Sequence, residues 1–247
     1  MEELTTEDTD LGLGLPSRGR PKASEAQGRE HPTRQTLIDA TRHLLSKRPN
    51  YDPTVDEILV ASGVSKGSLY HHFENGHHLI DEALLLSFSE GVDENIAQIE
   101  EALGDVSSRE EAALTFRLIT VVSQSSALRA RRGLRMRVLG RADEDSVFAQ
   151  KLLEEQNRLN NALTQQIKKM QDRGWVRNDF EAAAGSLLIQ AYSIGRKVGQ
   201  ITDDLVSENA WNTVIFRIIE QGLMGLPIEV SAQLDAGAEL DPQGDIS

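Results

Sequence analysis

The chain of 247 residues has no cysteine, only 7 prolines and few aromatic residues, at 4%. Without cysteine, disulfides, thiolate metal sites and cysteine nucleophiles are excluded. The core must be mainly aliphatic, and long stretches rich in Ala, Leu, Glu, Arg and Gln favour helices. No apolar run approaches the roughly 18 residues that a membrane-spanning helix needs. These absences predict a soluble, cytoplasmic and helical protein with no membrane association.

The motifs of common enzyme classes are absent too. The sequence contains no serine elbow, phosphate-binding loop, metal triad or pair of suitably spaced carboxylates. It therefore predicts neither an enzyme nor a cofactor.

The formal net charge of −13 is unevenly distributed along the chain. Residues 1–16 and residues 228–247 each carry five acidic and no basic side chains. Residues 17–72, by contrast, carry nine basic and six acidic side chains, a net charge of +3. The early segment thus has the sign of charge that phosphates attract. The acidity of the whole chain predicts that any such binding depends strongly on salt.

Apolar residues recur at helical spacing between Thr33 and Met224, and strand-like alternation persists nowhere in the sequence. We therefore predict an all-α protein in four parts. A disordered arm with a basic segment covers residues 1–30, and a helix-turn-helix head covers residues 31–78. A larger helical domain covers residues 79–227, and a disordered acidic tail covers residues 228–247.

Residues 54–73 have the spacing of a helix-turn-helix. Thr54 and Glu57 form a capping-box signature that starts the first helix. Gly63 permits the sharp turn, and Ser65 is placed to cap the second helix. The N-terminal residues of such a second helix face the major groove of DNA. The alternative interpretation is an ordinary helical hairpin with a polar face.

Small and polar side chains mark the face of the second helix that would meet DNA. Lys66 and Ser68 can reach phosphates or base edges, and Gly67 allows close approach to the backbone. Aromatic side chains with polar tips follow one turn later. The candidate DNA-binding residues of this region are Thr54, Ser65, Lys66, Gly67, Ser68, Tyr70 and His71.

The stretch GVSKGSLYHHF at residues 63–73 resembles, nearly residue for residue, the signature of the TetR family of bacterial transcriptional regulators. The wider resemblance covers residues 33–84. It implies a three-helix DNA-binding head and a larger C-terminal domain, over residues 79–227, that binds a ligand and forms a homodimer. It also implies that Ser68, Tyr70 and His71 contact DNA, mainly its backbone, with Lys66 close by.

One position departs from the family pattern. A lysine that contacts phosphate usually opens the fourth helix, and Gly76 takes its place here, followed by His77 and His78. The N–H groups at this helix start can still meet a phosphate. A protonated His77 would partly replace the missing charge and make DNA binding sensitive to pH.

Four histidines within eight residues also raise the possibility of a metal site. The DNA-facing helix already accounts for His71 and His72, and adjacent histidines point to different faces. No carboxylate is spaced to complete a site. We therefore predict no metal.

A second basic signal lies in the N-terminal arm, where Gly-Arg-Pro is flanked by bases as in the core of an AT-hook. Arg18, Arg20 and Lys22 would fit the narrow minor groove of A·T-rich DNA. The alternative is a solvated, flexible tail.

Six arginines crowd into residues 129–141 of the larger domain. They predict either a solvated, ion-paired helical surface or a site for an anionic effector, such as an acyl-CoA phosphate or a carboxylate. The family resemblance places the ligand pocket among the central helices, although core packing is the alternative for each candidate lining residue. These candidates are Phe116, Met136, Phe148, Leu152, Asn157, Gln190 and Tyr192.

Two helices expected at residues 179–201 and 207–224 are the candidate homodimer interface. The first is rich in small residues that permit close helix approach, and the second has an apolar stripe. The alternative is that both helices simply complete the monomer core.

These observations lead to one function with an alternative. We expect a repressor that binds a palindromic double-stranded DNA operator as a homodimer and is released by a small hydrophobic or amphipathic effector. The alternative is a DNA-binding regulator that responds to a protein partner or acts as an activator.

Overall fold

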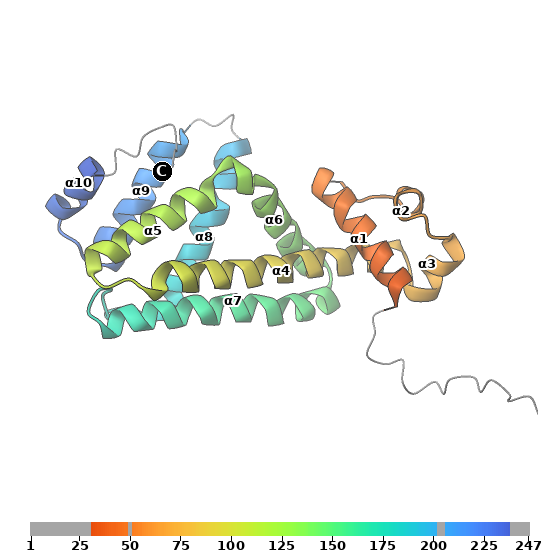
Figure 1. The fold of residues 1–247 in the computed structure, drawn as a ribbon, viewed down its shortest axis with the longest axis horizontal. Helices are drawn as coiled ribbons and strands as arrows, with labels where there is room; N and C mark the ends of the chain where they lie inside the picture. The colour runs from red at the N-terminus through yellow and green to blue at the C-terminus, as the bar shows by residue number, and fades with distance from the viewer. Residues whose placement is uncertain (1–30, 49–50, 202–205, 238–247) are drawn as a thin grey trace, which may run out of the picture.

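The structure is a computed structural model that describes residues 31–48, 51–201 and 206–237. Within these ranges every regular element is a helix, as the sequence predicts. A small head lies at one end, and the remaining helices form a larger body (Figure 1). The predicted all-α fold with a helical head and a larger helical domain is confirmed.

The head consists of three short helices: α1 (Pro32–Lys47), α2 (Val55–Ser62) and α3 (Lys66–His72). Its core is almost fully enclosed, because Leu37, Ile58 and Leu69 are each 0% exposed. Phe73, directly after α3, joins the same core. This packing fixes α3 against α1 and α2 and leaves its opposite face to solvent.

The local signals of the helix-turn-helix are present as the sequence predicts. The Thr54 hydroxyl accepts from the Glu57 N–H, and the Glu57 carboxylate accepts from the Thr54 N–H at 2.8 Å. Gly63 ends α2 with φ of 68°, in the left-handed region that favours glycine. The Ser65 hydroxyl caps α3 by accepting from the Ser68 N–H at 3.2 Å.

Helix α4 (Gly76–Gly104) connects the head and the body without a break. The predicted boundary between residues 78 and 79 therefore falls within its first turn. One hydrophobic core runs along this helix, from Leu79 beside the head to Val92 in the body. A shift of α4 would consequently be felt in both parts.

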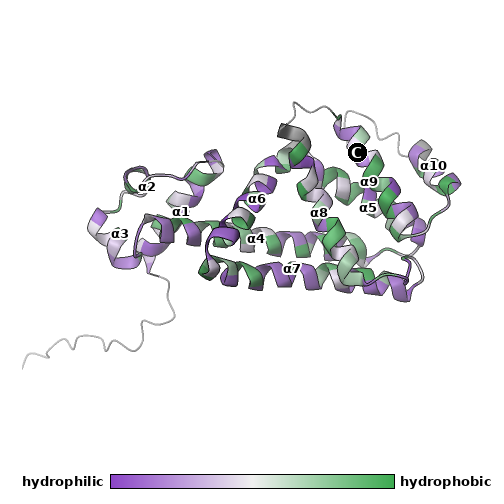
Figure 2. Cartoon of the chain, turned by 180° about the vertical axis from the view of Figure 1, so that it is seen from behind, coloured by the Kyte–Doolittle hydropathy of each residue, from purple (hydrophilic) through white to green (hydrophobic). Residues whose placement is uncertain are grey.

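The body adds α5 (Arg109–Gln124), a short 3-10 turn (Ser126–Leu128), α6 (Arg129–Glu144), α7 (Ser146–Asp172) and α8 (Ala182–Ile201). Helix α7 packs along both α4 and α8, and α6 packs against α4, α7 and α8. Figure 2 shows α4, α7 and α8 as mixtures of apolar and polar residues, the pattern of amphipathic helices with one buried face.

The chain continues with α9 (Glu208–Arg217), a π-helix (Ile218–Leu223) and α10 (Ile228–Gly237). Helix α10 lies within the segment that composition assigns to a disordered tail. Val230 and Leu234 pack on the second hydrophobic core of the body, and Arg117 of α5 bonds to the Ser231 carbonyl and to Asp235. These long-range contacts hold residues 228–237 against the body. The composition of this segment does not predict them.

Several predictions lie outside the described residues. The arm with Arg18, Arg20 and Lys22 and the last ten residues belong to this group. Among the helices that the structure describes, none is long and apolar enough to cross a membrane.

Candidate DNA-binding face and interior cavity

The outward face of α3 brings the predicted DNA-contact residues together. Lys66, Gly67 and His71 are exposed, and Tyr70 is 48% exposed despite its large ring. The Ser68 hydroxyl lies 3.0 Å from that of Ser65. Helix α3 itself carries no acidic side chain. Its face therefore offers hydroxyl, imidazole and ammonium groups to a phosphate backbone without a competing carboxylate.

Thr54 and Glu57 cap the start of α2. The Glu57 carboxylate also accepts from Arg48 at 2.6 Å. The N–H of Thr54, followed by Arg48, holds the pKa of Glu57 below its ordinary value. Thr54 is exposed, but its hydroxyl is engaged in the capping box.

The histidines near α3 divide into two groups. The His72 ring lies 4.7 Å from that of His31 and 5.1 Å from that of His71, between ring centroids. Partial burial, followed by the neighbouring His31 and His71, lowers the pKa of His72. His78 instead lies in the first turn of α4, and its Nε2 is 3.0 Å from the carboxylate of Glu82, one turn further along the same helix. In the described ranges, no three His, Cys, Asp or Glu side chains are placed to share a metal ion.

The start of α4 explains why Gly76 stands where the family usually has lysine. A Cβ atom at this position would lie 2.7 Å from the Cγ2 methyl of Val55 in α2. No real Cβ contact is this short, so any larger residue would push α2 away from α4. Asn75 caps the helix by accepting from the His78 N–H at 2.9 Å, while His77 is exposed beside it.

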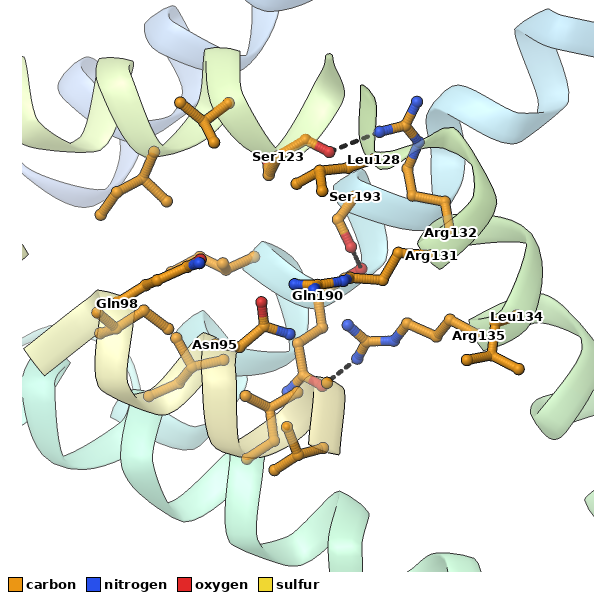
Figure 3. A pocket seen from close by; sticks show the side chains of 18 of the residues that line it. Asn95, Gln98, Ser123, Leu128, Arg131, Arg132, Leu134, Arg135, Gln190 and Ser193 are labelled. Atoms are coloured by element: carbon orange, nitrogen blue, oxygen red, sulfur yellow. Dashed lines mark hydrogen bonds between the residues drawn. The ribbon is translucent and has the colours of Figure 1, made fainter. Parts of the chain in front are cut away.

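The body encloses a cavity of about 320 Å³ among α4, α5, α6, α7 and α8. Aliphatic side chains form much of its wall, and amide, hydroxyl and guanidinium groups project into it (Figure 3). Leu118 and Val122 of α5 line it and are also 57% and 48% exposed, so the cavity opens to solvent beside α5. Its volume is within the range of small-molecule sites.

The seven predicted ligand-binding residues do not all meet at this cavity. Gln190 and Tyr192 line it, and the Tyr192 hydroxyl lies 3.2 Å from that of Thr120. Phe148 and Leu152 of α7 face the hydrophobic core that this helix shares with α4, because α7 packs against α4, α6 and α8. The other three lie away from the cavity wall: Phe116 packs on the second core, and Met136 and Asn157 are exposed.

Sequence reasoning missed several polar residues of the wall. Asn95 and Gln98 come from α4, and Ser193 comes from α8, one turn after Gln190 (Figure 3). These polar residues interrupt the apolar faces of their helices. That interruption is the feature of the sequence from which their place in the cavity wall could have been predicted.

The arginines of α6 divide between the surface and the cavity. Three form ion pairs with other elements: Arg131 with Glu94, Arg137 with Asp52, and Arg141 with Asp81. Asp52 belongs to the connection between α1 and α2, so α6 contacts the head directly. Arg132 and Arg135 turn inward, and together with Arg131 they line the cavity. The interpretation as an ion-paired helical surface therefore holds for Arg131, Arg137 and Arg141, whereas the site for an anionic ligand stays a prediction.

Helices α8 and α9 present an apolar face to solvent in the single chain. On α8, Leu187 and Val198 are 58% and 67% exposed; on α9 and the following turn, Val214 and Ile218 are 55% and 41% exposed. The small residues Ala182 and Gly185 face inward instead. Gly185 has no room for a side chain, because a Cβ would lie 2.9 Å from the Phe180 ring.

Two sequence comparisons agree with the geometry of the head. A profile of the family described as "Bacterial regulatory proteins, tetR family" matches residues 37–83, from α1 into α4. The HTH-type transcriptional repressor KstR2 of Rhodococcus jostii is 36% identical over 64 residues. These cover 26% of this chain and 31% of that protein, so the chain matches about a third of the curated relative's length.

Solved structures share the fold over most of the chain. A transcriptional regulator from Saccharomonospora viridis, in complex with choline, has a TM-score of 0.61 at 17% identity and covers 77% of this chain and 96% of its own. GusR of Salmonella enterica has a TM-score of 0.53 at 20% identity, covering 78% and 96%. These identities establish the fold alone. The signature on α3 and the profile match therefore place the head, at residues 37–83, in the DNA-binding region of the TetR family of bacterial transcriptional regulators, and the rest of the chain shares the fold of the solved regulators.

Proposed function

We propose that the protein is a homodimeric transcriptional repressor, acting in the cytoplasm, that leaves its DNA operator when a small molecule enters the cavity. The observation that carries this proposal is the position of α6. One side of α6 lines the cavity through Arg132 and Arg135, and the other side holds the head through Arg137.

DNA binding would use α3 as the recognition helix. Lys66 lies in its first turn, where side chains of such helices reach the major groove, and Tyr70 and His71 follow one turn later. The basic segment at residues 18–22 would add minor-groove contacts beside the head. Because the whole chain is acidic, these phosphate contacts must act at short range.

Coupling between the cavity and the head would pass through α6 and α4. The guanidinium of Arg141 forms two hydrogen bonds to Asp81 near the start of α4, at 2.9 and 3.0 Å. Arg137 meets Asp52 of the head. A ligand that binds one position of α6 better than another would therefore shift both ion pairs and reorient the head.

Dimerisation would bury the exposed apolar face of α8 and α9. A face of this kind is costly in water, and burying it against a second copy relieves that cost. Helices α8 and α9 of two chains would form a four-helix bundle about a two-fold axis. Two heads related by that axis would then match the two halves of a palindromic operator.

Small-molecule control is supported by the cavity and by one relative. The S. viridis regulator was solved with choline, which shows that a protein of this fold holds a small molecule. The cavity of this chain is lined by arginines, so the proposal concerns small-molecule binding and not choline itself. A protein partner in place of a small molecule remains the competing form of control.

The proposal is tested by footprinting the purified chain on the DNA upstream of its own gene. We expect symmetric protection whose half-sites are separated by about one helical turn or a multiple of it. An organic extract of the host cells should abolish the footprint. Deleting the gene should raise transcription from that site; a fall would identify an activator. Absence of any footprint at low salt would refute the proposal.

A further inference from the structure

The charged side chains that line the cavity all have the same sign. They are Arg131, Arg132 and Arg135, and no aspartate or glutamate is among the lining residues. Arg131 is neutralised by Glu94 on the surface side of α4. In the part of the chain that the structure describes, neither Arg132 nor Arg135 forms an ion pair with a carboxylate, although Glu208 acts to raise the pKa of Arg132; for Arg135 no carboxylate has such an effect.

Arg135 is the more unusual of the two. It reaches across the cavity from α6 to the side-chain oxygen of Gln190 on α8, which is a neutral partner (Figure 3). Its Nε has no hydrogen-bond partner among the described residues. Gln190 is only 6% exposed, and its oxygen also accepts from Gln156 at 2.6 Å. One amide oxygen therefore serves two donors, and Arg135 has donor capacity left over.

Arg132 is anchored differently, at the end of the cavity near α5. Its Nη1 donates to the carbonyls of Ser123 and Ser125 at 2.7 and 3.0 Å. Its Nε and Nη2 have no protein partner in the described ranges. The side chain is 6% exposed, so these donors do not reach bulk water readily.

Two guanidinium groups with unused donors in a buried cavity are unfavourable in free energy without an anion beside them. Burial lowers the pKa of both guanidinium groups, yet arginine keeps its proton in proteins. A buried charge that cannot be neutralised needs an opposite charge and partners for its donors. A carboxylate supplies both, because its two oxygens accept parallel hydrogen bonds from one guanidinium.

The rest of the wall specifies the remainder of the ligand. Apolar side chains from α4, α7 and α8 also line the cavity and are largely shielded from solvent. An aliphatic chain or ring system would be stabilised there by leaving water. The main apolar residues of this wall are Val92, Ile99, Leu159, Leu163 and Ile189.

We propose that the cavity binds an amphipathic carboxylate, with its carboxylate on Arg135 and its apolar part against α4, α7 and α8. The proposal rests on the function proposed above, in which this cavity is the effector site, and it names the chemical class of the effector. A carboxylate bound to the guanidinium of Arg135 would replace the hydrogen bond from Arg135 to Gln190. Helix α6 would then contact the ligand through Arg135.

Three probes of one chain length test the class of ligand: decanoate, decanol and decyltrimethylammonium, each below its micelle-forming concentration. Calorimetric titration into the full chain measures binding without DNA. We expect decanoate to bind at least tenfold more tightly than decanol, since a hydrogen bond to a charged group contributes about 1.5–3 kcal/mol. The cationic probe should bind more weakly than decanol.

Arg135→Gln should weaken decanoate binding at least tenfold while decanol binding changes less than twofold, and Arg135→Lys should restore part of the preference. Retained decanol binding shows that the variant cavity is intact. Arg129→Gln removes the same charge from an exposed position on α6 outside the cavity wall and should change neither affinity.

Three outcomes would overturn the inference. They are equal affinity of the wild-type protein for the three probes, decanoate binding that survives Arg135→Gln unchanged, and failure of all three probes to bind. Operator binding, measured on the same preparations, separates these failures from a failure of the proposed DNA-binding function.

Discussion

Arg117 is the position where removal of one side chain should cost most stability. Its guanidinium makes two hydrogen bonds to Glu220, one at 2.9 Å, and it reaches Asp235 at 2.8 Å. Glu220 is 1% exposed and Arg117 is 6% exposed. The pair connects α5 to the π-helix and to α10, so it holds the C-terminal part of the body together.

Arg117→Met leaves the Glu220 carboxylate buried without its main partner. Breaking a buried ion pair in this way costs about 3–5 kcal/mol. For a chain of this size, that loss lowers the melting temperature by about 6–20 °C. Asp235 is less affected, because it is half-exposed and keeps its contact with Arg217.

Urea unfolding at fixed protein concentration measures the change in the free energy of unfolding. The double variant Arg117→Met, Glu220→Leu removes both charges and should recover most of the loss. Arg158→Met breaks the surface pairs with Asp93 and Glu155 and serves as the control, with an expected cost of about 1 kcal/mol or less. A similarly small cost for Arg117→Met, or a double variant as unstable as the single one, would refute the reasoning.

Three further predictions concern the head and the dimer. The pKa of Glu57 is held below its ordinary value of 4.5. Its carboxylate therefore stabilises the fold above pH 4.5, and this stabilisation is lost as the pH falls through the lowered pKa. Glu57→Gln should make the loss of stability with falling pH less steep, and an unchanged pH profile would contradict this. His77 is exposed at the start of α4, so His77→Ala should weaken operator binding, and an unchanged affinity would remove His77 from the DNA contact. Leu187→Glu places a charge on the exposed apolar face of α8 and should yield monomers in sedimentation experiments; a dimer that persists would move the interface elsewhere.

The head could be predicted from the sequence because its signals are local. The capping box of Thr54 and Glu57, the left-handed turn at Gly63 and the Ser65 cap each act within four residues. The family signature lies in the same stretch. What these signals could not show is that Gly76 leaves no room for a side chain, because the limiting contact comes from Val55 in another helix.

The cavity could be predicted only in part because its wall is assembled from five helices. Gln190 and Tyr192 face it, while Phe148 and Leu152 face the core. Which face of α7 meets the cavity depends on how α4, α6 and α8 pack around it. Helix α10 could not be predicted from the sequence for the same reason. Arg117, which bonds to α10, lies more than a hundred residues earlier in the chain.

The most direct test of the account is equilibrium binding of the full chain to the footprinted upstream DNA, followed by fluorescence anisotropy. Lys66→Ala and Tyr70→Ala should each weaken binding about tenfold, and Lys66→Ala should also reduce the salt dependence by about one phosphate contact. Lys168→Ala removes an equal charge from the exposed surface of α7 and should leave binding unchanged. If the α3 variants bind this DNA as tightly as the wild-type chain, α3 is not the DNA-binding helix and the account is contradicted.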